Sequence, residues 1–260
     1  AQGKCKRLIV NMPPRHTKSE FASVFFPSWI MGLRPDMKIM QTTHTAELSA
    51  RFGRKVRNLM DTDEYKQIFD KVTLSADSKS AGRWETNKGG EYFAAGVGGA
   101  ITGRGADLLI IDDPHSEQDA LSPSALESAY EWYTSGPRQR LQPGGIIVIV
   151  MTRWSTLDLT EKLIRRMSED HADQWDILEL PAILENGEPL WPEYWKLEEL
   201  EAVKASIPIA KWNSQYMQNP TSEEGALIKR EWWQIWESDT PPNTSYILQS
   251  YDTAFSSKET

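Results

Sequence analysis

The chain has 260 residues, of which 39% are apolar and 25% are charged, and its formal net charge is -8. This composition is typical of globular proteins, and a chain of this length can form one large domain or a main domain with a small satellite. No segment approaches the roughly 18 consecutive apolar residues of a membrane span, so we expect a soluble protein with no membrane contact. The acidic balance excludes a dedicated nucleic-acid coat, and any contact with nucleic acid must be local.

The cysteine and histidine content indicates in which cellular compartment the protein works and whether it binds zinc. A single cysteine, Cys5, excludes an internal disulfide, and the scattered histidines lack the spacing of zinc ligands. We therefore expect a reducing, cytosolic compartment. The chain begins without a methionine and leads directly into a strand-like run, so we expect a fragment of a longer protein.

Apolar runs alternate with helical patterns through most of the chain, as in a parallel α/β sheet. The runs Leu108–Ile111 and Ile146–Met151 are apolar at every position, which is typical of central strands covered by helices on both faces. We therefore predict an α/β fold with a central, mostly parallel sheet flanked by helices. In chain order, the predicted elements are strand Arg7–Met12, helix Lys18–Met31, strand Lys38–Thr43, helix Ala46–Met60, strand Leu108–Ile111, helix Ser124–Ser135, strand Ile146–Met151, helix Leu157–Met167 and strand Trp175–Leu180.

The composition changes at about Ala182, where prolines, acidic helical segments and aromatic residues become frequent. We predict a main domain over residues 1–181, a linker subdomain over residues 182–245, and a new unit over residues 246–260 that opens with a strand at Tyr246–Tyr251. Tryptophans placed in this way are packing anchors more often than base-stacking platforms. The tryptophans of the predicted linker are Trp191, Trp195, Trp212, Trp232, Trp233 and Trp236.

The first candidate motif is a phosphate-binding loop, Pro-Pro-Arg-His-Thr-Lys-Ser, between the first strand and the first helix. Lys18 would reach the β and γ phosphates, and Ser19 would place its hydroxyl on Mg²⁺, as in the pattern G-x-x-x-x-G-K-[ST]. Both glycines of that pattern are replaced, by Met12 and Thr17, so an ordinary strand-to-helix turn with an exposed lysine remains the alternative. The residues expected to surround the nucleotide here are Pro14, Arg15, His16, Thr17, Lys18 and Ser19.

Two carboxylates follow the first of the two central strands. Asp112 is placed to hold Mg²⁺, directly or through water, and Asp113 to orient the attacking water as general base. The alternative is an ordinary strand end, in which Asp113-Pro114 opens a turn.

Thr152 and Arg153 follow the second central strand in the same way. Because ligands in open α/β sheets bind outside the carboxyl ends of the strands, we expect Lys18, Asp112 and Thr152 to converge on one crevice. This convergence predicts a nucleoside-triphosphate site, with Thr152 and Arg153 among the residues that bind the nucleotide.

A glycine-rich segment, Gly96–Gly105, leads into the strand that ends at Asp112. Glycines permit a mobile loop that approaches other groups closely, and Arg104 near its end could bring positive charge to the γ-phosphate held by a neighbouring subunit. A flexible hairpin with a solvated arginine is an equal alternative.

With these motifs the chain resembles the large terminase subunit of tailed bacteriophages, the motor that packages DNA into a preformed capsid. In that family the phosphate loop deviates from the glycine pattern and carries an arginine, to which Arg15 is similar. The resemblance runs through residues 13–19, residues 95–114 (Ala-Gly-Val-Gly-Gly-Ala-Ile-Thr-Gly-Arg-Gly-Ala-Asp-Leu-Leu-Ile-Ile-Asp-Asp-Pro), residues 144–154 (Gly-Gly-Ile-Ile-Val-Ile-Val-Met-Thr-Arg-Trp) and residues 251–256 (Tyr-Asp-Thr-Ala-Phe-Ser).

The resemblance implies an ASCE-type ATPase domain that binds ATP and Mg²⁺. Arg15, Arg104 and Asp113 would be the catalytic residues, with Arg104 as an arginine finger acting on a neighbouring subunit. Thr152-Arg153 resembles the segment that couples hydrolysis to motion. Many members carry Asp-Glu where this chain has Asp112-Asp113, and aspartate is one methylene shorter, so the base is the least typical part of the site.

The family also has a C-terminal nuclease domain with a ribonuclease H-like fold, in which clustered acidic residues hold two metal ions. Asp252 resembles the first of these metal ligands, so residues 246–260 would begin that domain. Two-metal cleavage needs several carboxylates, and we do not expect the chain as given to cut DNA.

The resemblance further implies partners and a location. The partners would be double-stranded DNA, the capsid portal protein and the small terminase subunit, with the chain itself forming a homo-oligomeric ring on the portal. The location would be the host cell cytoplasm, with transient docking on the portal vertex of the procapsid. Two alternatives remain open, namely a helicase or other P-loop nucleic-acid translocase, and a DNA- or capsid-binding module that does not hydrolyse nucleotide.

Overall fold

The structure is a computed structural model that describes residues 4–99, 101 and 103–221. The rest of the predicted linker, its tryptophans Trp232, Trp233 and Trp236, the predicted strand Tyr246–Tyr251 and the predicted metal ligand Asp252 lie outside the described residues. Within the described part, no helix is both long enough and apolar enough to cross a membrane.

A single sheet of eight strands forms the centre of the described chain, in the order β3-β4-β5-β2-β6-β7-β1-β8. From β5 to β8 all neighbouring strands are parallel, whereas β3 and β4 pair antiparallel at one edge. The predicted α/β class with a mostly parallel sheet is therefore confirmed. The strands are β1 Arg7–Asn11, β2 Lys38–Thr43, β3 Leu74–Lys79, β4 Arg83–Thr86, β5 Glu91–Gly96, β6 Ala106–Asp112, β7 Leu141–Met151 and β8 Asp176–Glu179.

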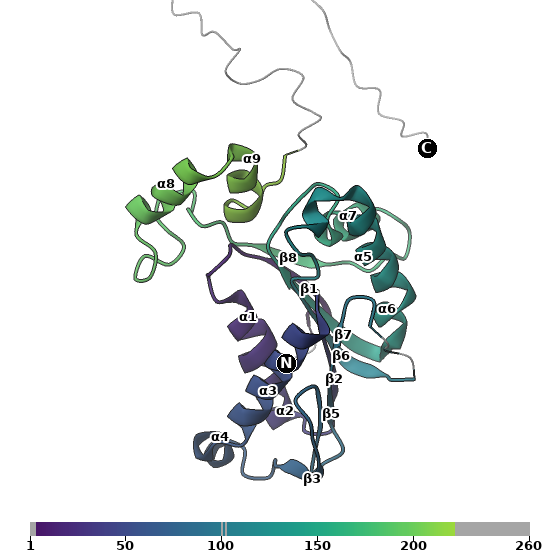
Figure 1. The fold of residues 1–260 in the computed structure, drawn as a ribbon. Helices are drawn as coiled ribbons and strands as arrows, with labels where there is room; N and C mark the ends of the chain where they lie inside the picture. Colours follow the sequence, from purple (N-terminus) through teal and green to yellow (C-terminus); the bar gives the residue numbers. More distant parts are fainter. Residues whose placement is uncertain (1–3, 100, 102, 222–260) are drawn as a thin grey trace, which may run out of the picture. The chain divides into compact units, whose positions relative to one another are not determined.

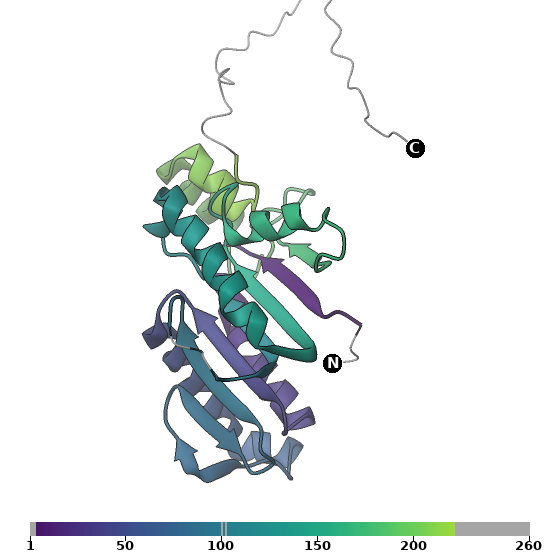
Figure 2. The same ribbon diagram turned by 90° about the vertical axis from the view of Figure 1, so that its right-hand side faces the viewer.

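Helices cover both faces of the sheet. Figure 1 shows α1 to α4 on one face and α5 to α7 on the other, and Figure 2 shows the second layer from its outer side. The α-helices are α1 Lys18–Glu20, α2 Phe26–Leu33, α3 Ala46–Met60, α4 Asp63–Ile68, α5 Pro123–Ser135, α6 Pro137–Arg140, α7 Leu159–Arg166, α8 Leu197–Ser206 and α9 Ile209–Lys211. Three shorter helical segments join them: the π-helical turns η1 Phe21–Phe25 and η3 Trp212–Tyr216, and the 3₁₀ turn η2 Asp119–Leu121.

The central strand β6 shows why the sheet is rigid where the predicted motifs lie. Its residues alternate between two cores, with Leu108 and Ile110 packed on one face and Leu109 and Ile111 on the other, all fully buried. Burial of each such side chain contributes about 1.5–3 kcal/mol. The carboxyl end of β6, at Asp112, is therefore held from both faces of the sheet.

The predicted helix Lys18–Met31 is helical throughout but is not one α-helix. It is divided into α1, the π turn η1 and α2. Pro27 explains the change, because proline has no N–H to donate to the carbonyl four residues earlier. Nearby, the hydroxyl of Ser28 donates to the carbonyl of Val24 at 2.6 Å. By contrast, β2 and α3 have the predicted bounds.

The glycine-rich segment is not a hairpin. It joins β5 to β6, and both strands pair parallel with β2, which lies between them. The segment therefore returns from the carboxyl end of β5 to the amino end of β6, and it does so without a helix between Gly96 and Ala106 in the part that is described. Arg104 consequently lies at the amino end of the sheet.

The residues after β8 form a small hydrophobic cluster of their own around Ala182, Leu200 and Trp212. Trp212 is 2% exposed, so it is a packing anchor, as the sequence predicted. Trp195 packs against the same cluster, and Figure 1 shows α8 and α9 next to the loop that joins β1 to α1.

Candidate active site

The carboxyl ends of three neighbouring strands, β6, β7 and β1, bring the predicted motifs together. The ammonium of Lys18, in the first turn after β1, donates to Thr152 Oγ1 at 2.9 Å. It lies 3.0 Å from Asp113 Oδ2. Thr152 in turn donates its hydroxyl to the carbonyl of Met12 at 3.1 Å, which ties β7 to the start of the loop. The predicted convergence of Lys18 with the second and third motifs is therefore present.

Asp112 lies beneath this contact and is 1% exposed. Its Oδ1 accepts from Ser19 Oγ at 3.0 Å, and its Oδ2 accepts from Ser23 Oγ at 2.6 Å. Gln41 on β2 donates to the Ser23 hydroxyl at 3.0 Å. The sequence analysis did not include Ser23 or Gln41, although Ser23 follows Ser19 by one helical turn and so faces the same side.

Burial raises the pKa of the Asp112 carboxyl to about 7, and the neighbouring charge of Asp113 adds to the effect. Hydrogen bonds from Ser23 and Ser19 and the charge of Lys18 act in the opposite direction but are outweighed. Near neutral pH this carboxyl therefore exchanges its proton readily, which is what a cation ligand must do.

The oxygen atoms of Ser19 and Asp112 fit Mg²⁺, which prefers oxygen ligands and is usually held by one or two carboxylates together with phosphates and water. Among the described residues no group of three His, Cys, Asp or Glu side chains could hold a metal ion by itself. A cation at this place would therefore depend on ligands from a bound phosphate, as in a nucleotide complex.

Asp113 has a left-handed backbone, with φ of 42°. Aspartate tolerates this conformation better than most residues. The geometry turns the carboxylate toward β7, where Oδ1 accepts from the Thr152 N–H at 2.9 Å. The side chain is 29% exposed. It can therefore reach a water molecule at the surface of the site.

The phosphate loop contains two non-glycine residues in the left-handed region, Arg15 with φ of 61° and Thr17 with φ of 65°. Thr17 stands at the position of the second glycine in the standard pattern, so the chain keeps the backbone conformation while losing the residue that adopts it freely. Each such conformation costs about 1–3 kcal/mol and persists only where the surroundings impose it. Arg15 itself is exposed to solvent.

His16 lies between these two residues and is buried. Its Nδ1 lies 2.8 Å from the carbonyl of Pro14, and its ring stacks on Trp195 with centroids 5.8 Å apart. Burial lowers the pKa of His16, so the ring is neutral at physiological pH. Because a carbonyl only accepts, Nδ1 carries the proton and Nε2 is an acceptor. Trp195, like Ser23 and Gln41, is a functional candidate that the sequence motifs did not include.

Arg153 does not turn toward Lys18. Its guanidinium pairs with Asp158 at 3.0 Å, with Glu161 at 2.7 Å and with Glu179 at 3.5 Å. Burial acts to lower the pKa of Arg153, but Asp158 and Glu161 together raise it above its ordinary value. These ion pairs connect the end of β7 with α7 and β8, so in this structure the side chain ties elements together rather than facing the phosphate loop.

Arg104 also lies away from the phosphate loop. Its guanidinium pairs with Glu91 at 2.6 Å, at the amino end of β5, and lies 4.2 Å from the centre of the Phe93 ring. The phosphate loop and the two aspartates are at the opposite ends of the strands. Within one chain, Arg104 therefore lies at the amino ends of the strands, whereas the candidate site lies at their carboxyl ends.

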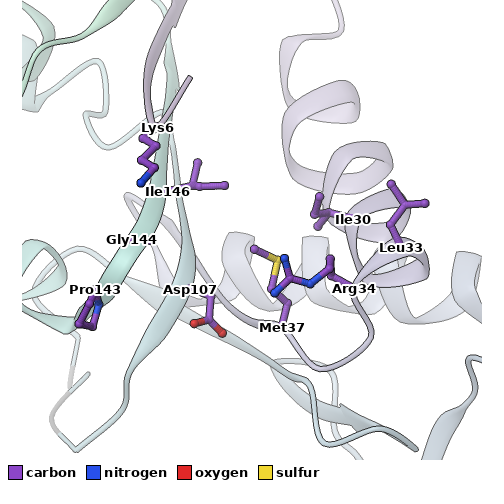
Figure 3. Close-up of a pocket in the computed structure, with 10 residues that line it drawn as sticks. Lys6, Ile30, Leu33, Arg34, Met37, Asp107, Pro143, Gly144 and Ile146 are labelled. Carbon is purple, nitrogen blue, oxygen red and sulfur yellow. The ribbon is translucent and has the colours of Figure 1, made fainter. Parts of the chain in front are cut away.

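A cavity of about 380 Å³ opens at this amino end of the sheet and is shown in Figure 3. Lys6, Arg34 and Asp107 line its rim, and Ile30 and Met37 are among its apolar residues. Because Asp107 lies near the amino end of β6 and Asp112 ends the strand, this cavity is separate from the site at Lys18.

The mostly parallel sheet, the loop that presents Lys18 and the buried carboxylate at the end of a neighbouring strand together form one candidate site at the carboxyl ends of the strands. No protein-family model matches the chain, and no curated protein sequence matches it. The comparison with solved structures does show similar folds.

The ATPase domain of the Thermus phage P74-26 large terminase is 14% identical, with a TM-score of 0.55, over 85% of this chain and 90% of that one. A mutant of the same domain gives a TM-score of 0.54 over 84% and 90% of the two chains. A large terminase from another thermophilic bacteriophage, solved in complex with ATP-gamma-S, is 9% identical, with a TM-score of 0.45 over 84% and 48%. The chain thus has the fold of a terminase ATPase domain.

Proposed function

We propose that the chain is the ATP-hydrolysing motor subunit of a viral DNA-packaging terminase, which translocates double-stranded DNA into a procapsid. The observation that carries this proposal is the meeting of Lys18, Asp113 and Thr152 within 3.0 Å contacts above the buried Asp112. The fold, which resembles terminase ATPase domains, supports it.

The residues of the loop have complementary tasks in nucleotide binding. The backbone of the loop and the start of α1 would hold the phosphates, and Lys18 would supply a positive charge to the β and γ phosphates. Ser19 and Asp112 would hold Mg²⁺, which neutralises charge on the phosphate oxygens when bound. Thr152 would fix the Lys18 ammonium from the side of β7, as it does in the structure.

Asp113 would act as the general base. In the reaction, a water molecule attacks the γ-phosphorus, its proton passes to the Asp113 carboxylate, and the bond to the β–γ bridging oxygen breaks to leave ADP and phosphate. Lys18 now pairs with Asp113, so it must turn to the phosphates before this carboxylate can take a proton. The backbone N–H of Thr152 remains on Asp113 Oδ1 and keeps the carboxylate oriented.

Arg15 and Arg104 would supply further positive charge. Arg15 is exposed on the loop, and Arg104 would serve as the finger that reaches a neighbouring subunit's γ-phosphate, because within its own chain it lies at the other end of the sheet. Under this proposal the chain would form a homo-oligomeric ring on the capsid portal protein, with the small terminase subunit and double-stranded DNA as further partners. The packaging motor would dock on the portal vertex in the host cell cytoplasm.

The direct test is steady-state phosphate release by rings assembled on portal-bearing procapsids with linear duplex DNA. Wild type is compared with Lys18→Ala and with Asp112→Asn. We expect release to depend on DNA and to be lost in both variants. Equal rates for wild type and Lys18→Ala would refute the proposal, and duplex unwinding without packaging would favour a helicase.

A second candidate is a DNA- or capsid-binding module that does not hydrolyse nucleotide. The ion pair between Lys18 and Asp113 favours it, because a lysine that stayed on this carboxylate could not serve the phosphates. Titration calorimetry with a non-hydrolysable ATP analogue and Mg²⁺ separates the two. Binding supports the ATPase, whereas its absence supports the inert module.

A further inference from the structure

The phosphate loop is supported from outside by one aromatic contact. Trp195, which lies in the segment after β8, stacks on His16 with ring centroids 5.8 Å apart and ring planes inclined by 15°. Trp195 is itself held in place, since its backbone N–H donates to the carbonyl of Trp191 at 2.8 Å and its ring meets the Tyr194 ring edge-on. The contact therefore joins a fixed tryptophan to a loop residue.

His16 is the middle residue of the strained part of the loop. Its neighbours Arg15 and Thr17 both have positive φ, and His16 is held between them by its contact with the carbonyl of Pro14 and by the stack on Trp195. Thr17 is β-branched, for which the left-handed region is a genuine outlier. A loop without glycine needs such an outside constraint to keep this shape.

The stack depends on ring packing rather than on hydrogen bonds. Both His16 Nε2 and Trp195 Nε1 are buried, and neither has a hydrogen-bond partner among the described residues. The indole N–H thus makes no hydrogen bond at this contact that a phenyl ring would lose. Phenylalanine should therefore replace Trp195 with little loss, whereas a small side chain should not.

We propose that Trp195 is a positioning residue for the phosphate loop, holding the glycine-free turn in its binding shape by stacking on His16. Through this contact, the segment after β8 holds the loop backbone in its left-handed conformation at Thr17. A glycine at this position would not need such support. The inference rests on the proposed function, because the shape matters for phosphate binding only if the loop binds a nucleotide.

A rescue experiment tests this role. The chain is titrated calorimetrically with a non-hydrolysable ATP analogue and Mg²⁺. The wild type is compared with Trp195→Ala, Trp195→Phe, Thr17→Gly and the double variant Thr17→Gly/Trp195→Ala. We expect Trp195→Ala to weaken binding about tenfold, equivalent to about 1.4 kcal/mol. Trp195→Phe should stay within about twofold of wild type.

The double variant separates positioning from general packing. Glycine adopts positive φ without strain, so Thr17→Gly should tighten binding about threefold, and the double variant should bind within about twofold of Thr17→Gly alone, whereas independent effects would leave it about threefold weaker than wild type. A merely structural role for Trp195 would lower the melting temperature without this rescue. Unchanged binding in Trp195→Ala, or no rescue by Thr17→Gly, would overturn the proposal.

Amide hydrogen exchange of the nucleotide-free chain keeps the two proposals distinguishable. If wild type binds no nucleotide, the proposed function fails, but the support of the loop is still measured. We expect Trp195→Ala to speed exchange at Phe21, whose N–H donates to the carbonyl of Thr17 at 3.2 Å, at least tenfold while the amides of β6 keep wild-type rates. Equal exchange at the loop in both chains would refute the positioning role whatever the nucleotide result.

Discussion

The ammonium of Lys18 lies 3.0 Å from Asp113 Oδ2 and 2.9 Å from Thr152 Oγ1, so one cation joins the ends of three strands. The Lys18 side chain is 9% exposed and that of Asp113 is 29% exposed, which leaves the carboxylate open to solvent on one side. In the nucleotide-free chain the pair satisfies both charges. Under the proposed function, a bound phosphate would compete with Asp113 for the same ammonium and would free the carboxylate to accept a proton.

Replacement of Lys18 by alanine should therefore remove both phosphate binding and hydrolysis. We expect phosphate release by the assembled ring to fall at least about 100-fold, as when a charged group that stabilises a transition state is lost. The measurement is steady-state phosphate release with saturating Mg²⁺ and DNA. Lys88, exposed in the turn between β4 and β5, is the matched control, and Lys88→Ala should behave as wild type. Equal losses in both variants would point to a general charge effect.

The raised pKa of Asp112, about 7, predicts that the metal-free chain loses stability as the pH rises. The folded chain retains a proton that the unfolded chain, with an ordinary carboxyl near 3.8, has already released. Between about pH 5 and pH 7 unfolding therefore releases a proton, and the free energy of unfolding should fall by about 1 kcal/mol per pH unit from this group. Above pH 7 the contribution of Asp112 levels off.

Urea unfolding in EDTA at pH 5, 6, 7 and 8 measures this dependence. The Asp112→Asn variant cannot titrate here, so its stability should fall less steeply with pH than that of wild type. Parallel curves for the two chains would contradict the assignment. With nucleotide present, affinity for Mg²⁺ should rise with pH up to about 7, because the cation displaces the same proton.

Arg104→Ala should abolish hydrolysis in the assembled ring while leaving nucleotide binding unchanged, if the guanidinium acts on the neighbouring subunit. Arg83 offers a close control, because it lies 3.0 Å from the same Glu91 oxygen that Arg104 contacts at 2.6 Å. Each variant removes one ion pair with Glu91, but only Arg104→Ala removes the proposed finger. Arg83→Ala should therefore retain hydrolysis. A ring of Arg104→Ala subunits that hydrolyses ATP normally would remove the arginine from the reaction.

The two central strands of the sheet could be predicted because each contains a run that is apolar at every position. Leu108–Ile111 and Ile146–Met151 lie within β6 and β7, and the polar residues that follow them meet at one edge. By contrast, the sequence analysis assigned no elements to α4 or to β3, β4 and β5. The antiparallel strands β3 and β4 carry mostly polar residues and lack the continuous apolar run of a central strand.

The finer features of the site depend on contacts between distant parts of the chain. Nothing near Trp195 in the sequence indicates that its ring stacks on His16, and nothing near Thr17 indicates a left-handed backbone, since threonine rarely adopts one. Ser23 could have been found, because it follows Ser19 by one helical turn and bonds the same carboxylate. The ion pairs of Arg153 could not, because they need α7 and β8 to be in place.

Arg153 provides the last prediction, which concerns stability. Its side chain is 4% exposed and that of Asp158 is 0% exposed, so removal of the guanidinium leaves a buried carboxylate without its counter-charge. Loss of one partner of a buried pair typically costs about 3–5 kcal/mol. We therefore expect Arg153→Met to lower the melting temperature by roughly 10 °C, measured by calorimetry, because each kcal/mol corresponds to about 2–4 °C in a chain of this size.

Arg165 is the control for this change, because it pairs with Glu161 at 3.3 Å but is 61% exposed. Exposed ion pairs contribute little, so Arg165→Met should leave the melting temperature nearly unchanged. Arg153→Lys should fall between the two, since lysine keeps the charge but cannot bridge Asp158 and Glu161 with one planar group. If Arg153→Met instead melted as wild type and lost nucleotide binding, the guanidinium would belong to the nucleotide site. The ion pairs across α7 and β8 would then be incidental to the fold.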